Sequence, residues 1–204
     1  MSQHIIVKDY CNLWEKMFKQ EQKLIGQILQ DNCLYIYHIG STAVKGLKAK
    51  PIIDIMPVVK DLEKVDDLKN KFEQIGYEYL GEFGIDGRRY LRKGGDERTH
   101  QIHMFSADNK KEIERHLAVR DYLRTHKKIA DEYGVLKQKL ALKFPYDING
   151  YCEGKENFVK ELERKAILWK QKSFYSESNI RHLQKIKSDI ADGKAKFLEH
   201  DLID

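Results

Sequence analysis

Two neighbouring segments of the chain combine residue types that could hold a phosphate group and a divalent cation. The apolar run Leu34–Ile39 ends at Gly40 and Ser41, and the next apolar run, Pro51–Val59, contains a lone carboxylate, Asp54. Glycine at a tight turn lets a phosphate approach the chain, and the exposed backbone N–H groups can bind it. A carboxylate on the following strand could hold a cation against that phosphate. Taken alone, the Gly-Ser pair is equally compatible with an ordinary turn.

Two histidines later in the chain could ligate a metal as neutral imidazoles or transfer a proton. Both lie in a strand candidate, Thr99–Phe105. Side chains alternate between the faces of a strand, so His100 and His103 point to opposite faces. Only one of them can therefore reach Asp54 unless a bulge intervenes. A hydrogen-bonded structural histidine is an equally good interpretation of each.

Arginines on the neighbouring strand candidates could bind an anion, because the planar guanidinium fork suits phosphate and carboxylate. We expect Arg89 and Arg98 to contact the anion, with Arg88 a weaker candidate. The alternative for all three is the solvated face of a short antiparallel strand.

Three residues outside these strands are further candidates for the pocket wall. Lys50 immediately precedes the strand that carries Asp54. Tyr151 and Lys155 are one helical turn apart, so they share a face of the helix predicted there and could close the pocket from the C-terminal half. They could equally cover the edge of the sheet.

Hydrophobic periodicity predicts an α+β fold with a helical C-terminal half. Strands are predicted over 34–39, 51–59, 77–83, 88–92 and 99–105. Helices are predicted over 9–31 and 61–75, in two stripes from residue 110 to the Phe-Pro break at 144–145, over 149–172 and over 179–192. Residues 1–172 are expected to form one domain, and residues 173–204 a helical appendage.

Composition and charge exclude several classes of protein. The chain has 204 residues, 41% of them hydrophobic, which suits a globular domain. No apolar run approaches the roughly 20 residues of a membrane helix, and the N-terminus lacks signal-peptide features, so we expect a cytoplasmic protein with no membrane partner. Three cysteines without CxxC spacing indicate neither a disulfide framework nor a zinc knuckle. The net charge of +5 includes no basic block, so nucleic acid is not expected as the main partner.

Three stretches of the chain carry a resemblance to a known family. The stretch "HIGSTAVKGLKAKPIIDI" contains the turn and Asp54, and "RRYLRKGGDERTHQIHMF" combines an arginine-rich strand with a Thr-His-x-x-His strand. The stretch "RDYLRTHKKIADEYGVLKQKLALKFPYDINGYCEGKENFV" includes Tyr151 and Lys155. Together these motifs cover about residues 30–170, in order. On these motifs the chain resembles the GrpB family of small bacterial proteins.

The GrpB family is assigned to the nucleotidyltransferase superfold, so the resemblance implies a nucleotidyltransferase-like sheet that is minimal, mixed or antiparallel, and flanked by helices packed on one side. In that superfold a Gly-Ser turn holds a triphosphate, and Asp-x-Asp/Glu on the next strand holds two Mg²⁺ ions. Gly40, Ser41 and Asp54 match the pattern, but Met56 stands where the second carboxylate belongs. The Thr-His-x-x-His strand occupies the place of a third carboxylate, which favours His103 as the histidine at the site.

The resulting hypothesis has a phosphate-binding part and a metal-binding part. The phosphates of an NTP, bound as substrate or ligand, would contact Gly40, Ser41, Thr42, Lys50, Arg89, Arg98, Tyr151 and Lys155. Mg²⁺ would be held by Asp54 with His100 or His103. Asp54 and His103 would be the catalytic residues.

Three functions fit these expectations. The first is a Mg²⁺-dependent nucleotidyltransferase that moves a nucleoside monophosphate from an NTP to an unknown acceptor, with a substitute for the carboxylate that Met56 replaces. The second is a module that binds a nucleotide or another phosphorylated metabolite without turning it over. The third is an interaction protein that binds a protein partner through its C-terminal tail.

The tail carries the third hypothesis. The stretch "NIRHLQKIKSDIADGKAKFLEHDLID" has an apolar stripe at helical spacing, formed by Ile180, Leu183, Ile186 and Ile190. Its helix and its ending resemble the tails of Phd/YefM antitoxins, which bind a toxin. The alternative is an ordinary C-terminal helix with frayed ends.

Overall fold

The computed structural model describes residues 4–174 and 177–192. The chain divides into two compact units, Met1–Ile167 and Leu168–Asp204. The first unit contains every candidate site residue named above. The domain boundary expected after residue 172 stays a prediction. No helix in the described ranges is both long enough and apolar enough to cross a membrane.

The first unit is built on a five-stranded sheet in the order β1-β2-β5-β4-β3. The strands are β1 (Cys33–Ile39), β2 (Ile53–Val59), β3 (Tyr77–Tyr79), β4 (Arg88–Lys93) and β5 (His100–Ser106). The β2–β5 pair is parallel, and the β1–β2, β4–β5 and β3–β4 pairs are antiparallel. The predicted α+β class with a mixed sheet is therefore confirmed.

Seven α-helices are found in the described ranges. They are α1 (Leu13–Leu29), α2 (Glu63–Asp66), α3 (Lys69–Gln74), α4 (Lys110–Thr125), α5 (Lys127–Lys143), α6 (Ile148–Phe174) and α7 (Glu177–Ala191). The single helix predicted over 61–75 is wrong, because the chain forms two short helices there. Between them the N–H of Leu68 donates to the carbonyl of Val65, a three-residue spacing that winds the chain more tightly than an α-helix does.

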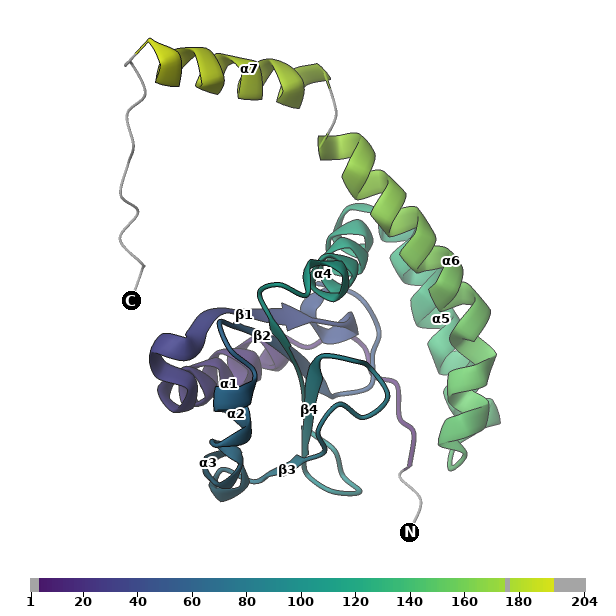
Figure 1. Cartoon of the computed structure of the whole chain (residues 1–204). Coiled ribbons are helices and arrows are strands. Elements are labelled where there is room, and N and C mark those ends of the chain that lie inside the picture. The colour runs from purple at the N-terminus through teal and green to yellow at the C-terminus, as the bar shows by residue number, and fades with distance from the viewer. Residues whose placement is uncertain (1–3, 175–176, 193–204) are drawn as a thin grey trace. The chain divides into compact units, whose positions relative to one another are not determined.

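Helices pack on both faces of the sheet, not on one face as the resemblance implied (Figure 1). On one face, Ile53, Ile55 and Ile102 join the main core. Helices α1 and α3 cover this face with side chains that include Trp14, Phe18, Ile25 and Phe72. On the other face, Ile39, Met56 and Phe105 pack against Ile113 and Leu117 of α4. The alternation of side chains along β2 and β5 therefore decides which residues can meet on the α4 face.

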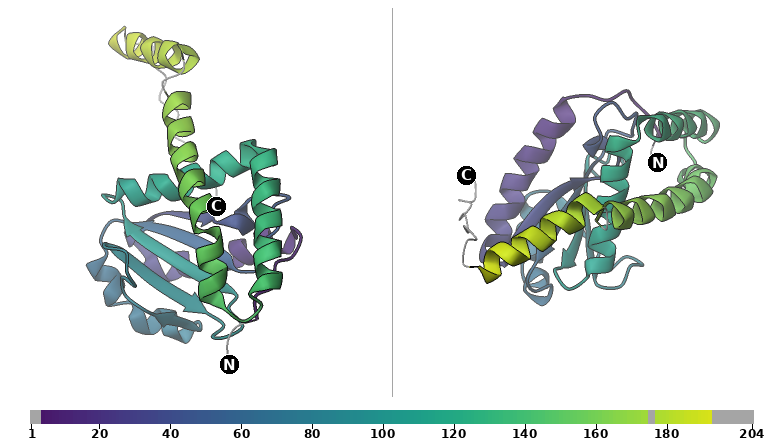
Figure 2. Two further views of the ribbon diagram at one scale, coloured as in Figure 1. Left: turned by 90° about the vertical axis from the view of Figure 1, so that its right-hand side faces the viewer. Right: turned by 90° about the horizontal axis from the view of Figure 1, so that it is seen from above.

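Helices α5 and α6 form a hairpin beside the α4 face, seen from the side in Figure 2. A Cβ at Gly154 of α6 would collide with the side chain of Leu140 on α5, so glycine permits the close approach of the two helices. The ring of Tyr133 on α5 stacks on that of Phe158 on α6, with centroids 5.1 Å apart. This packing brings one face of each helix toward the start of β2.

An N-terminal segment fastens the loop between β1 and β2 to this helical hairpin. The N–H of Ile5 donates to the carbonyl of Pro145 at 2.8 Å, at the turn between α5 and α6. Three residues on, Lys8 and Ala49 exchange two backbone hydrogen bonds of 2.8 and 2.9 Å. Ile5 is buried against Leu140 and Tyr151. The segment thus fixes the chain that carries Lys50 against the helices.

Candidate functional site

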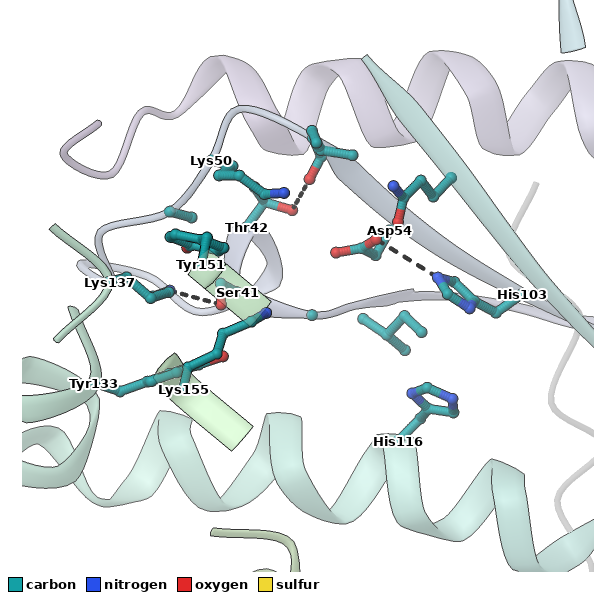
Figure 3. A pocket seen from close by; sticks show the side chains of 15 residues that line it. Ser41, Thr42, Lys50, Asp54, His103, His116, Tyr133, Lys137, Tyr151 and Lys155 are labelled. Carbon is teal, nitrogen blue, oxygen red and sulfur yellow. Dashed lines mark hydrogen bonds and ion pairs between the residues drawn. The ribbon is translucent and has the colours of Figure 1, made fainter. Parts of the chain in front are cut away.

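A cavity of about 300 Å³ lies over the sheet where β1 ends and where β2 and β5 begin. Its wall comes from the β1–β2 loop, the first residues of β2 and β5, and the inner faces of α4, α5 and α6 (Figure 3). Of the residues predicted for the site, it brings together Gly40, Ser41, Thr42, Lys50, Asp54, His103, Tyr151 and Lys155. It also contains residues that the sequence did not single out, notably Gln101, His116, Tyr133 and Lys137.

The turn after β1 and the carboxylate on β2 are in direct contact. Ile39 and Asp54 are partners in the β1–β2 ladder, so the turn begins beside the carboxylate. Gly40 has φ +68°, a conformation that L-residues rarely adopt, and a Cβ there would collide with the Asp54 side chain. Glycine is therefore needed both for the backbone conformation and for the space that Asp54 occupies.

Ser41 is linked to a buried lysine of α5. The Nζ of Lys137 donates to the Oγ of Ser41 at 2.8 Å and lies 4.3 Å from the centroid of the Tyr133 ring. Lys137 is only 3% exposed. Burial, with a further contribution from the ammonium of Lys155, lowers the pKa of Lys137 to about 7. A signal existed in the sequence, because Lys137 lies one helical turn after Tyr133 on the face that the apolar stripe predicts to be buried.

Two further cavity lysines lie over the same aromatic ring. The Nζ atoms of Lys50 and Lys155 each lie 5.3 Å from the centroid of Tyr151, a buried residue of α6. Burial, followed by repulsion from Lys155, lowers the pKa of Lys50. Each of the three cavity lysines is thus held over a ring, where the quadrupole stabilises a cation.

Asp54 faces His103 across the cavity floor. Their Oδ1 and Nε2 atoms are 3.6 Å apart. On the other side of the ring, Nη1 of Arg88 lies 3.4 Å from Nδ1 of His103. A guanidinium can only donate, so Nδ1 accepts, and the ring proton is on Nε2, facing the carboxylate. Arg88 is itself fixed by the carbonyls of Glu82 and Phe83, to which its Nε and Nη2 donate at 3.2 and 2.6 Å.

A second histidine borders the same region from α4. The rings of His103 and His116 have centroids 5.6 Å apart. Burial, with repulsion from Arg115 as the next cause, lowers the pKa of His116 to about 2, so this ring is neutral at physiological pH. Arg115 lies 3.1 Å from Nε2 of His116 and donates to it, which leaves the ring proton on Nδ1.

Thr42 lines the cavity, but its hydroxyl is engaged in holding the loop. Its Oγ1 donates to the carbonyl of Ile52 at 3.1 Å. Its only hydroxyl proton is thereby used, so Nε2 of His38, 3.0 Å away, is the donor to Oγ1. The side chain of Thr42 therefore braces the loop from Gly40 to Asp54.

Three residues predicted for the site lie elsewhere. His100 points to the α1 face, where its Nδ1 lies 2.9 Å from Oγ1 of Thr99, because it differs from His103 by an odd number of positions on β5. Arg89 also points to that face and forms an ion pair of 2.6 Å with Asp66. Arg98 does not line the cavity, and its buried Nε has no hydrogen-bond partner within the described ranges.

The donor set of the cavity does not fit a Mg²⁺ ion held by paired carboxylates. Asp54 is the only carboxylate among the lining residues. Met56 shares its face of β2 but is fully buried with Ile39 and Phe105 beneath α4. No group of three or more His, Cys, Asp or Glu side chains suited to a metal ion occurs in the part of the chain that the structure describes. A hard cation such as Mg²⁺ binds several oxygen ligands, and the cavity lining would offer it a single carboxylate.

Similar proteins are found by sequence and by structure. The family described as "GrpB protein" matches residues 4–165. UPF0157 protein YqkA of Bacillus subtilis is 43% identical over 162 residues, 79% of this chain, and the match spans 47% of that protein's length. Glutamate-rich protein GrpB of Alkalihalophilus pseudofirmus is 34% identical over 78% of this chain and 93% of its own.

Among solved structures, the crystal structure of conserved protein GrpB from Enterococcus faecalis has a TM-score of 0.79 and 49% identity. The match covers 81% of this chain and 99% of the Enterococcus faecalis chain. A structure of Cid1 in complex with its short product ApU has a TM-score of 0.44 at 12% identity. A similarity this low says nothing about the activity of this chain. With the family match over most of the chain and these close relatives, the chain belongs to the GrpB family.

Proposed function

We propose that the cavity binds a phosphorylated small molecule, with a nucleotide as the first candidate. The observation that carries this proposal is the set of cavity lysines, Lys50, Lys137 and Lys155. None of the three makes an ion pair with a residue in the described ranges, although all three are at least half-buried. Buried ammonium groups are costly unless a counter-charge accompanies them, so the arrangement favours a bound anion.

The part of the cavity around Asp54, Gln101 and His103, on the far side of the turn from the lysines, suits the rest of such a ligand. Figure 3 shows Asp54 and His103 apart from Ser41 and Lys137. Asp54 and Gln101 lie side by side at the start of β2 and β5, and the side-chain oxygens of both can accept hydrogen bonds from hydroxyl groups of a ligand. The cavity therefore suits a molecule with phosphate at one end and hydroxyl or ring-nitrogen groups at the other, as in a nucleotide.

Calorimetric titration tests this proposal with ATP, GTP, CTP, UTP and tripolyphosphate. Lys137→Met and Lys155→Met should each weaken binding by about tenfold or more, because each removes a buried charge-assisted contact. Lys139→Met is the matched control, since Lys139 is an exposed residue of α5 that does not line the cavity. Equal affinities for Lys137→Met and Lys139→Met would contradict the proposal.

The facing pair of Asp54 and His103 favours a second candidate, nucleotidyl transfer. An acceptor hydroxyl beside Asp54 would lose its proton to the carboxylate as its oxygen forms a bond to the α-phosphorus. The bond from that phosphorus to the bridging oxygen would break, and pyrophosphate would leave with its charge on the lysines. Asp54→Asn keeps the shape but removes the base, so it should retain nucleotide affinity and lose pyrophosphate release. Unchanged pyrophosphate release in Asp54→Asn would exclude this role for Asp54.

Binding of a protein partner through the tail stays a separate proposal. Residues 193–204, which carry the ending similar to Phd/YefM tails, lie outside the described residues. Within α7 the predicted stripe is present, and Ile180, Leu183, Ile186 and Ile190 are 39%, 44%, 40% and 51% exposed. Removal of residues 176–204 should abolish capture of such a partner while nucleotide affinity is retained.

A further inference from the structure

We infer that the cavity binds its phosphate ligand as the free anion, with lysine ammonium groups in the place of a divalent cation. This inference rests on the proposed function and specifies the form in which the ligand is recognised. Three observations support it: where the positive charges lie, what surrounds Asp54, and which ring nitrogen of His103 carries the proton.

The positive charge needed by a polyphosphate is already built into the wall. Lys137 is anchored 2.8 Å from the Oγ of Ser41, at the turn where backbone N–H groups can meet a phosphate. The Nζ atoms of Lys50 and Lys155 are both held 5.3 Å from the centroid of the Tyr151 ring. The region already holds three ammonium groups and one carboxylate. A Mg²⁺ ion bound to the same phosphates would add positive charge there, so the ion and the ammonium groups would repel each other.

Among the described residues, the cavity offers Asp54 no second carboxylate as a companion ligand for a cation, and the side chain beside it on β5, Gln101, is uncharged. The ladder partners of Asp54 are Ile39 on β1 and Gln101 on β5. The next position on the same face of β2 is Met56, which is buried in an apolar cluster. A substitute carboxylate at Met56 would therefore lie beneath α4, away from the cavity.

The position of the ring proton on His103 also argues against a bound metal ion. Its Nδ1 accepts from Arg88, so the N–H that faces Asp54 is on Nε2. A metal ligand needs a lone pair at that atom. In this arrangement Nε2 carries a proton, so it can donate to a ligand oxygen but has no lone pair for a metal ion, and Oδ1 of Asp54 lies 3.6 Å from it.

The first arm of the test compares nucleotide binding by calorimetry in EDTA and in excess Mg²⁺. Free ATP and tripolyphosphate should bind in EDTA, and Mg²⁺ should weaken the affinity by about tenfold, because the chelated ligand presents less negative charge to the lysines. Binding that occurs only with Mg²⁺ would overturn this inference and leave the proposed function intact. Absence of binding under both conditions would overturn the proposed function and this inference together.

The second arm uses the metal alone, so its result does not depend on a nucleotide. Mn²⁺, a paramagnetic substitute for Mg²⁺, is added to the ligand-free protein and to Asp54→Ala, and the free ion is measured by electron paramagnetic resonance. Equal free Mn²⁺ with both proteins supports the inference. Mn²⁺ bound by the unmodified protein and released in Asp54→Ala would overturn it. Asp61→Ala is the control, since Asp61 lies in the loop after β2, outside the cavity.

Discussion

The ammonium of Lys137 donates to the hydroxyl of Ser41 across 96 residues of sequence. This contact joins α5 to the turn after β1, on the sheet side of the cavity (Figure 3). It also means that the serine which the sequence identifies as a phosphate contact is already paired with a cation. A phosphate at Ser41 would therefore meet a hydroxyl and an ammonium at once.

Because of Lys137, the free energy of unfolding should rise with pH above neutrality. Its pKa falls to about 7 in the folded chain, from 10.5 in an exposed lysine. Between these pH values the unfolded chain binds more protons, so the free energy of unfolding rises with pH from about 7 to about 10.5. Below pH 7 both states are charged, and the burial penalty is fully present.

Lys137→Met removes that penalty. The variant should be more stable than the parent protein at pH 6, by on the order of 2–4 kcal/mol, and the difference should shrink as pH rises toward 10. Urea unfolding at a series of pH values measures it, with Lys139→Met as the control. A constant difference across the series would show that Lys137 is charged throughout.

The same lysine predicts proton uptake when an anion binds. A phosphate beside Lys137 stabilises the ammonium and raises its pKa, so above pH 7 binding should take up a proton. The affinity should fall with pH by up to about tenfold per unit above pH 7. Calorimetry in buffers of different ionisation enthalpy counts the protons. Zero uptake at pH 8 would contradict a charge-coupled role for Lys137.

Gly40→Ala should destabilise the protein and displace Asp54. Its φ of +68° adds strain of about 1–3 kcal/mol, and the new Cβ collides with the carboxylate. Gly46→Ala is the matched control, because Gly46 also has a positive φ, +84°, but has nothing near its Cβ position. Urea midpoints should therefore fall further for Gly40→Ala. Equal losses for the two variants would show that the collision with Asp54 has no cost.

Met56→Asp should destabilise the protein without creating a metal site. Met56 is fully buried against Phe105, so an unpaired carboxylate there should cost about 3–5 kcal/mol. Met56→Leu conserves volume and should cost less than about 1.5 kcal/mol. Thermal unfolding with and without Mg²⁺ measures both. A Met56→Asp variant stabilised by Mg²⁺ would contradict the burial argument.

Arg88 should be a positioning residue for His103. It fixes the ring proton on Nε2 of His103, whereas Arg115 fixes that of His116 on Nδ1. Nitrogen-15 spectra of the imidazoles should thus show opposite tautomers for the two residues. Arg88→Gln should mix the tautomers of His103 and leave His116 as the internal control in the same spectrum. An unchanged His103 signal would show that another group sets its tautomer.

Local sequence patterns predicted the five strands, although the third ends at Tyr79 and not at Phe83, and they predicted part of the candidate site. The alternation of side chains separates His100 from His103, and the glycine after β1 marks the turn beside Asp54. The apolar stripe of α5 indicates a buried face for Lys137, but its contact with Ser41 could not be predicted from the sequence, because Ser41 lies on a different element and only the packing of α5 on the loop joins them. The position of Arg89 outside the cavity could not be predicted for a related reason, since its face of β4 depends on a register that short, charged strands specify weakly.

The N-terminal segment has a consequence for how the cavity opens. Ile5 and Lys8 fasten the loop that carries Lys50 to the turn between α5 and α6. Fraying of this segment would therefore loosen one wall of the cavity, and a ligand that contacts Lys50 would slow the fraying. The backbone amides of Ile5 and Lys8, neither of which lines the cavity, thus become reporters of its occupancy by hydrogen exchange.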